Sequence, residues 1–235
     1  MTDKNTEIDQ NIELYFFDPN QEKDNYIDFY KEIKTDRCNK EKGYRYSPLF
    51  FLMKDIRYCF GARKQFNPIR KNGLDPANFA GVILTHLAFN NLVKRFYSGN
   101  YVQFAKKYMG IANSEDLSAL NDLRNALVHN NYSLSVYNKK KEEKIYFSLG
   151  LGDGFEEVIK KDDNWKTDYK SSTYRVNPRK LMTAFEHGCR EYKSYLLDHK
   201  NSKARQRFTE AFDPDQWTYI HDPSVANADI ETNSK

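Results

Sequence analysis

One segment restricts the possible folds more than any other: residues 76–97, which read PANFAGVILTHLAFNNLVKRFY. It opens with a proline, which is well tolerated in the first turn of a helix, and its middle is apolar on nearly every side. Its apolar run is interrupted by His86 and is shorter than the roughly 18–20 residues that span a membrane. The segment therefore predicts the central helix of a helical bundle that does not enter a membrane.

Further helices are predicted around this segment. Capping residues, prolines and a glycine mark where four of them begin, near residues 47, 99, 114 and 178. The helix from 114 carries leucines at 117, 120, 123 and 127, a spacing that forms one buried stripe. Apolar residues alternate with polar ones on either side of the charged turn NKKKEEK (138–144), which predicts a β-hairpin. The expected fold is mainly α, a bundle of four to five helices with a small β-hairpin insertion.

The chain is expected to divide into three parts. Residues 1–46 form an N-terminal extension with a short helix at NYIDFYKEI (25–33), and residues 47–200 form the helical domain. The hairpin and a polar insertion occupy about 132–173, and 201–235 is expected to be a C-terminal tail. The acidic first residues lack the apolar stretch of a secretory signal, so we expect a cytoplasmic protein.

Charge is distributed unevenly along the chain. Residues 1–36 carry 4 basic and 10 acidic side chains, whereas residues 37–111 carry 14 basic and 3 acidic ones. Such a basic block suits a polyanionic partner such as RNA, although solvation of helix faces gives the same composition. Several of its cations stand beside aromatic residues, a mixture that suits stacking on single-stranded RNA. The candidate substrate-binding residues are Arg57, Arg63, Lys64, Lys94 and Arg95.

No metal or cofactor site is predicted. The three cysteines, Cys38, Cys59 and Cys189, are far apart and lack the paired spacing of a zinc site, so we expect reduced structural thiols. The histidines show no ligand spacing either. His86, in the middle of the apolar helix, is better interpreted as a core histidine bonded to a backbone carbonyl than as a catalytic accessory.

The most informative stretch is RNALVHNNY, residues 124–132. Arg124 and His129 are five residues apart, which separates them by about 140° on an ideal helix. Asn125 and His129 are four apart and share one side of the helix, outside the leucine stripe. A histidine near a helix end is often a partner of the helix dipole, but a histidine and an arginine are also the two groups that cleave RNA without a metal. The base removes the proton of the 2′-hydroxyl, and the guanidinium stabilises the charge on the phosphate.

RNALVH resembles the R-x4-6-H signature of the HEPN superfamily, in which an asparagine commonly follows the arginine, as Asn125 does here. The order of the predicted elements over about 47–200 is also similar to that family. The resemblance implies a metal-independent endoribonuclease whose site is shared by two protomers, with a 2′,3′-cyclic phosphate and a 5′-hydroxyl as products. It implies that His129 is the general base or acid, that Arg124 clamps the phosphate and that Asn125 orients one of them. Such proteins commonly act in toxin or anti-phage defence systems, with an antitoxin or regulatory partner.

Three neighbours of the motif are candidates for a supporting role: Asp122, Asn130 and Tyr132. HEPN toxins paired with a nucleotidyltransferase often carry a tyrosine two residues after the histidine, whereas Tyr132 is three residues after His129. Tyr132 is equally placed to be the first strand residue of the hairpin. Two functions stay open: a homodimeric HEPN ribonuclease, and a non-catalytic HEPN-type subunit that binds RNA or a nucleotide or acts as a scaffold.

Overall fold

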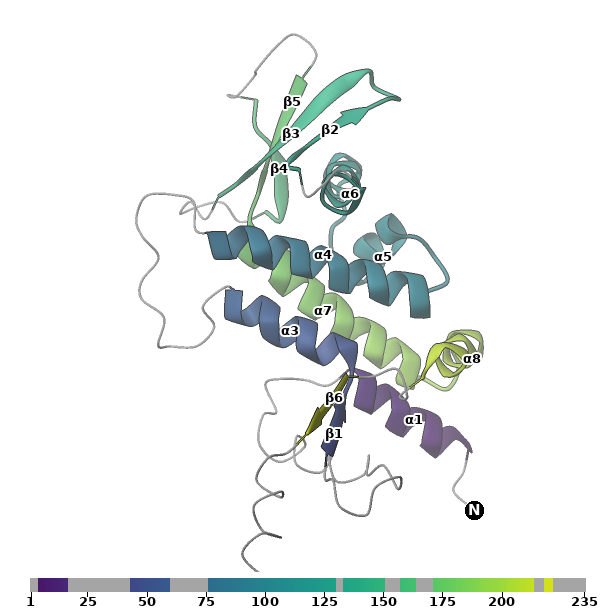
Figure 1. The fold of residues 1–235 in the computed structure, drawn as a ribbon. Helices are drawn as coiled ribbons and strands as arrows, with labels where there is room; N and C mark the ends of the chain where they lie inside the picture. The colour runs from purple at the N-terminus through teal and green to yellow at the C-terminus, as the bar shows by residue number, and fades with distance from the viewer. Residues whose placement is uncertain are drawn as a thin grey trace, which may run out of the picture.

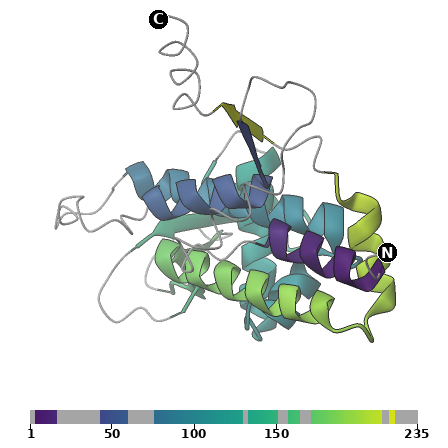
Figure 2. The same cartoon turned by 90° about the horizontal axis from the view of Figure 1, so that it is seen from below.

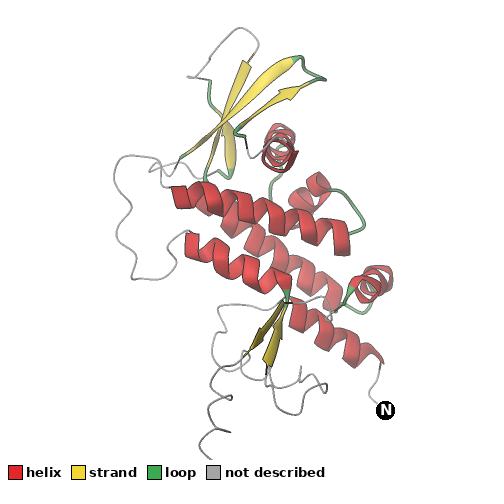
Figure 3. Cartoon of the chain, in the orientation of Figure 1, coloured by secondary structure: helices red, strands yellow, loops and turns green. Residues whose placement is uncertain are grey.

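The computed structural model describes residues 4–16, 43–59, 76–129, 133–150, 157–163, 171–213 and 218–221. This part of the chain is mainly helical, with a small four-stranded sheet (Figure 3). The helices are α1 (Lys4–Tyr15), α3 (Pro48–Cys59), α4 (Pro76–Phe96), α5 (Tyr101–Tyr108), α6 (Ser114–His129), α7 (Pro178–Leu197) and α8 (Ser202–Ala211). The strands are β1 (Gly43–Tyr46), β2 (Ser135–Asn138), β3 (Glu143–Leu149), β4 (Ile159–Lys161), β5 (Ser171–Val176) and β6 (Thr218–His221). The helix expected at 25–33 lies outside the described residues.

Helix α4 is the centre of the bundle, as its composition predicted. It packs against α3, α5, α6, α7 and α8 (Figure 1). Phe89, Leu92 and Phe96 are buried on it, and Leu87 is an exception at 36% exposed. None of the helices in the described ranges is both long and apolar enough to cross a membrane.

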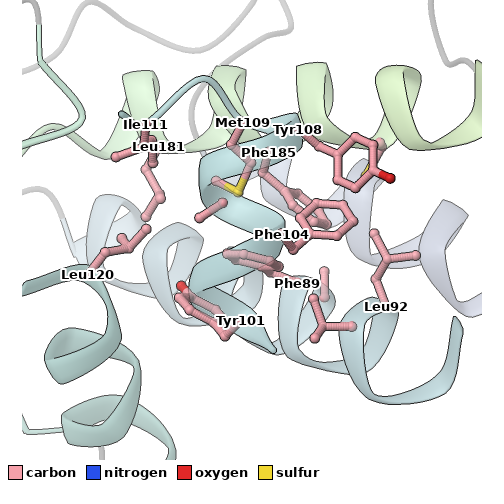
Figure 4. Packing of buried hydrophobic residues seen from close by; sticks show 14 of the residues in the cluster. Phe89, Leu92, Tyr101, Phe104, Tyr108, Met109, Ile111, Leu120, Leu181 and Phe185 are labelled. Atoms are coloured by element: carbon pink, nitrogen blue, oxygen red, sulfur yellow. The ribbon is translucent and has the colours of Figure 1, made fainter. Parts of the chain in front are cut away.

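Aromatic side chains fill the space between α4, α5 and α7. Phe104 of α5 is fully buried and its ring lies 5.3 Å from that of Phe89 and 5.5 Å from that of Tyr192 (Figure 4). The hydroxyl of Tyr192 donates a hydrogen bond of 2.7 Å to the carbonyl oxygen of Phe96, so its burial leaves no polar group unsatisfied. These rings join α7 to α4 and α5, the two helices that contact α6.

The helix starts follow the capping residues in the sequence. The backbone N–H of Phe50 donates to Ser47 Oγ at 3.1 Å at the start of α3, and Asn177 Oδ1 accepts from the first turn of α7. Asn100 and Gln103 form a capping box at α5. At α6 the cap is Asn113, whose Oδ1 accepts the backbone N–H of Glu115 at 2.8 Å. The predictions of these four helix starts are confirmed.

The β-structure is larger than the predicted hairpin. The hairpin itself is present as β2 and β3, but the sheet has the order β2-β3-β5-β4, with β3 and β5 parallel and the outer pairs antiparallel. The segment expected to be a polar insertion supplies β4 and the first half of β5. β4 is only three residues long, too short to show an alternating pattern, and it forms because β5 offers it a hydrogen-bonding edge.

The ends of the chain also join the fold. The expectation of a tail from residue 201 is wrong for residues 202–211, because these form α8, whose Phe208 is fully buried. Arg205, only 3% exposed, donates hydrogen bonds to Asp9 Oδ1 at 2.6 Å and to the carbonyl oxygen of Leu196 at 2.9 Å. α1 thereby lies against α7 and α8 (Figure 2), and β6 pairs with β1.

Candidate functional site

The motif helix α6 lies against α4, α5 and one side of the sheet. It runs across α4 and is seen nearly end-on in Figure 1. The four leucines at 117, 120, 123 and 127 are buried, which confirms the predicted stripe. Arg124 and Asn125 are half-buried beside this stripe, and His129 is exposed in the last turn. The leucines therefore fix the helix and leave one of its polar sides at the surface.

The side chain of Arg124 is held by two amides. Its Nη1 donates to Asn125 Oδ1 at 2.8 Å, and its Nη2 donates to Asn90 Oδ1 of α4 at 2.7 Å. Its Nε is buried and has no hydrogen-bond partner within the described ranges. None of the described carboxylates forms an ion pair with this guanidinium. Its hydrogen-bond partners are neutral amides, which do not neutralise its positive charge. A cation in such surroundings is suited to bind an anion.

A buried histidine and tyrosine pair lies close enough to Arg124 to be affected by its charge. His86 Nδ1 and the hydroxyl of Tyr101 share a hydrogen bond of 2.6 Å, and both residues are buried. Burial, together with the positive charge of Arg124, lowers the pKa of His86 to about 3, so its ring is neutral at pH 7. Burial likewise raises the pKa of Tyr101 well above its usual value. The prediction of a core histidine was right, but the partner of Nδ1 is a hydroxyl and not a backbone carbonyl.

The low pKa of His86 has a consequence for acid stability. Between about pH 6.5 and pH 3 the unfolded chain binds a proton at His86 and the folded chain does not. Stability therefore falls as the pH drops through this window, by up to about 1.4 kcal/mol per pH unit from this residue. The free energy of unfolding of the wild type and of His86→Gln is measured in urea at about pH 6 and about pH 4.5. The decrease between the two pH values is expected to be about 2 kcal/mol smaller in His86→Gln than in the wild type.

The control for this measurement is His187→Gln, which changes an exposed histidine of α7. An equally deep fall in the stability of the His86→Gln variant would show that the proton is not excluded at His86.

The structure separates the other candidate residues of the motif. Asp122 Oδ2 accepts a hydrogen bond of 3.0 Å from Asn138 Nδ2 and so ties α6 to β2. Burial raises the pKa of Asp122, and this hydrogen bond opposes the rise. His129 makes no hydrogen bond or ion pair with any other described residue. Asn130 and Tyr132 lie outside the described residues. Arg124 and Asn125 are thus in contact, whereas His129 stands apart from them.

The predicted substrate-binding cations differ in their exposure to solvent and in whether an acidic side chain neutralises them. Arg57 Nε is 2.6 Å from Glu186 Oε1, an ion pair that joins α3 to α7. Arg95 is half-buried against the ring of Phe96, and only Lys94 is exposed. Arg63 and Lys64 lie outside the described residues. In the described basic set, Lys94 has the least restricted charge.

No protein family matches the sequence, and the chain matches no curated protein and no solved structure. In the part of the chain that the structure describes, no group of three or more His, Cys, Asp or Glu residues could hold a metal ion. The thiol of Cys189 is buried, which raises its pKa and keeps it protonated.

Two residues of this site are poorly marked in the sequence. Asn90 and Asn91 follow His86 on the same predicted helix, and the sequence makes them candidates to support the motif only if that helix lies against it. The structure shows this packing and a hydrogen bond from Arg124 to Asn90. Tyr101 carries no such signal, because it is an aromatic residue at the start of a different helix. Its role depends on the packing of α5 against α4, which no local pattern encodes.

Proposed function

We propose that this protein is a homodimeric endoribonuclease of the HEPN type that cleaves RNA without a metal ion. The observation that carries the proposal is the state of Arg124. Its guanidinium is half-buried, is held by the amides of Asn90 and Asn125, and forms no ion pair with a described carboxylate. It belongs to the same helix as an exposed histidine, His129. A fixed cation and a histidine are the groups that phosphodiester cleavage by the 2′-hydroxyl requires.

The reaction follows from these two groups. His129 accepts the proton of the ribose 2′-hydroxyl, and the 2′-oxygen forms a bond to phosphorus. The bond from phosphorus to the 5′-oxygen breaks, and the leaving oxygen takes a proton from the His129 of the second protomer, which acts as the acid. Arg124 stabilises the negative charge on the phosphate oxygens. The products are a 2′,3′-cyclic phosphate and a 5′-hydroxyl.

A second protomer enters the proposal because of the geometry of α6. Arg124 extends towards α4, whereas His129 is exposed in the last turn, and no hydrogen bond within the described residues joins it to Arg124, Asn90 or Asn125. The HEPN resemblance adds that two protomers bring their arginines and histidines to one composite cleft. It also suggests a toxin or anti-phage role in the cytoplasm, restrained by an antitoxin or another regulatory protein.

One observation favours a second function. None of the described residues hydrogen-bonds to the ring of His129, so nothing in them fixes its orientation or its tautomer. A HEPN-type subunit that binds RNA or a nucleotide through Arg124 and does not cleave it would have the same structure.

Cleavage of labelled RNA in EDTA distinguishes the two functions. The wild type is expected to release fragments that end in a 2′,3′-cyclic phosphate. Arg124→Ala/His129→Ala is expected to lose this cleavage by at least about 1,000-fold, since both the cation and the base are removed. The matched control is His187→Ala/Arg190→Ala, which removes the same residue types from exposed positions on α7.

The outcomes have separate meanings. RNA binding without cleavage by the wild type would support the binding subunit. Equal cleavage by the Arg124→Ala/His129→Ala variant and the control would show that the activity does not arise at this motif.

A further inference from the structure

The groups that the structure shows interacting with Arg124 are neutral. Two amide oxygens accept its hydrogen bonds, and its charge acts on the nearby pair of His86 and Tyr101. His86 and Asn90 are four residues apart, so they share the side of α4 that faces α6. Neither carries a charge at neutral pH.

Asn90 is the member of this group that comes from another helix and touches Arg124 directly. Its Oδ1 accepts from Nη2 at 2.7 Å across the contact between α4 and α6. α4 packs against five other helices and buries Phe89 and Leu92, which flank Asn90 and Asn91 in the sequence. A guanidinium has five N–H donors. The bonds to Asn90 and Asn125 use one donor on each terminal nitrogen, and no other hydrogen bond joins these two nitrogens to a described residue.

We propose that Asn90 is a positioning residue for Arg124, holding the guanidinium in place while leaving its positive charge uncompensated for a phosphate of RNA. This inference rests on the proposed function, because it names the group that prepares the phosphate clamp of that site. The proposed role requires the side chain of residue 90 to be a neutral amide. A carboxylate at this position would hold the arginine equally well but would neutralise it.

Asn90→Asp tests this distinction, because the two side chains have nearly the same size and shape. The aspartate can accept the same hydrogen bond from Nη2, so a purely structural role of Asn90 predicts unchanged cleavage. The positioning role predicts a loss of about 100-fold, the effect of removing one donor that acts on transition-state charge. Asn91→Asp is the matched control, since it makes the same charge change at the next, also half-buried, residue of α4.

Asn90→Ala provides a second variant in case the aspartate disturbs folding, which thermal unfolding of each variant will show. It removes the tether without adding a charge, and cleavage is expected to fall at least about 10-fold as the guanidinium loses its fixed position. Unchanged cleavage by a folded Asn90→Ala or Asn90→Asp variant would overturn the proposal.

A binding measurement separates this inference from the proposed function. The affinity for single-stranded RNA is measured at several salt concentrations in the His129→Ala variant, which keeps Arg124 and lacks the proposed base. Adding Asn90→Asp is expected to reduce the slope of log affinity against log salt by about 0.7, the value for one lost phosphate contact. If the wild type cleaves no RNA, the ribonuclease proposal fails, and this slope still decides whether Asn90 leaves Arg124 free to bind phosphate. An unchanged slope relative to Asn91→Asp would refute the positioning role, even in a protein that cleaves RNA.

Discussion

Arg124→Lys is expected to lower the rate of RNA cleavage by about 100-fold, although it keeps the positive charge. The guanidinium is planar, and it donates to Asn125 and Asn90 at the same time from two different nitrogens. An ammonium has three donors on a single atom, so it cannot keep both amide bonds and still present two parallel donors to a phosphate. Single-turnover cleavage rates with labelled RNA will measure the loss.

Arg190→Lys is the control, because Arg190 is exposed on α7 and is not part of the proposed site. If Arg124→Lys cleaved RNA within about threefold of the wild type, a positive charge alone would be sufficient. The fixed geometry at Arg124 would then have no part in the reaction.

Phe104→Ala is expected to reduce the free energy of unfolding by about 3–5 kcal/mol. The ring is fully buried between α4, α5 and α7, where rings from all three helices surround it, so its loss leaves a cavity (Figure 4). Since domains of this size are typically stable by about 5–15 kcal/mol, this single change removes a large part of the total. Urea unfolding followed by circular dichroism gives the value.

Tyr137→Ala provides the comparison for this change. It also removes an aromatic ring, but from the edge strand β2, where Tyr137 is 59% exposed. Its effect is expected to stay within about 0.5 kcal/mol. A loss of the same size in both variants would mean that the ring cluster is not the core of the fold.

The helices that the sequence predicts best are those with local signals. Ser47, Asn113 and Asn177 mark their starts with side chains that cap the following turn, and the leucines of α6 are spaced to form its buried stripe. Each of these signals needs only a few neighbouring residues, so it can be recognised without knowing the fold.

The elements that the sequence did not predict depend on distant partners. β4 forms because it pairs with β5. α8 is stabilised by the burial of Phe208 and by the hydrogen bonds of Arg205 to Asp9 of α1 and to the carbonyl oxygen of Leu196 of α7. The site shows the same division. The pattern of Arg124 and His129 could be recognised from their spacing, whereas the bond from Arg124 to Asn90 joins residues 34 apart in the sequence. Contacts of this kind are decided by how helices pack, which a periodic pattern does not specify.

The contact of Asp9 with Arg205 joins α1 to α8, two helices that lie nearly 200 residues apart in the chain. Aromatic rings connect the same two helices: Tyr15 of α1 and Phe208 of α8 pack against each other, and both pack against Phe96 of α4. During synthesis on the ribosome, α1 is made long before α7 and α8, so its contacts with these two helices can form only after most of the chain has been translated. Contacts between residues this far apart in the sequence slow folding, because a long loop must close before they form.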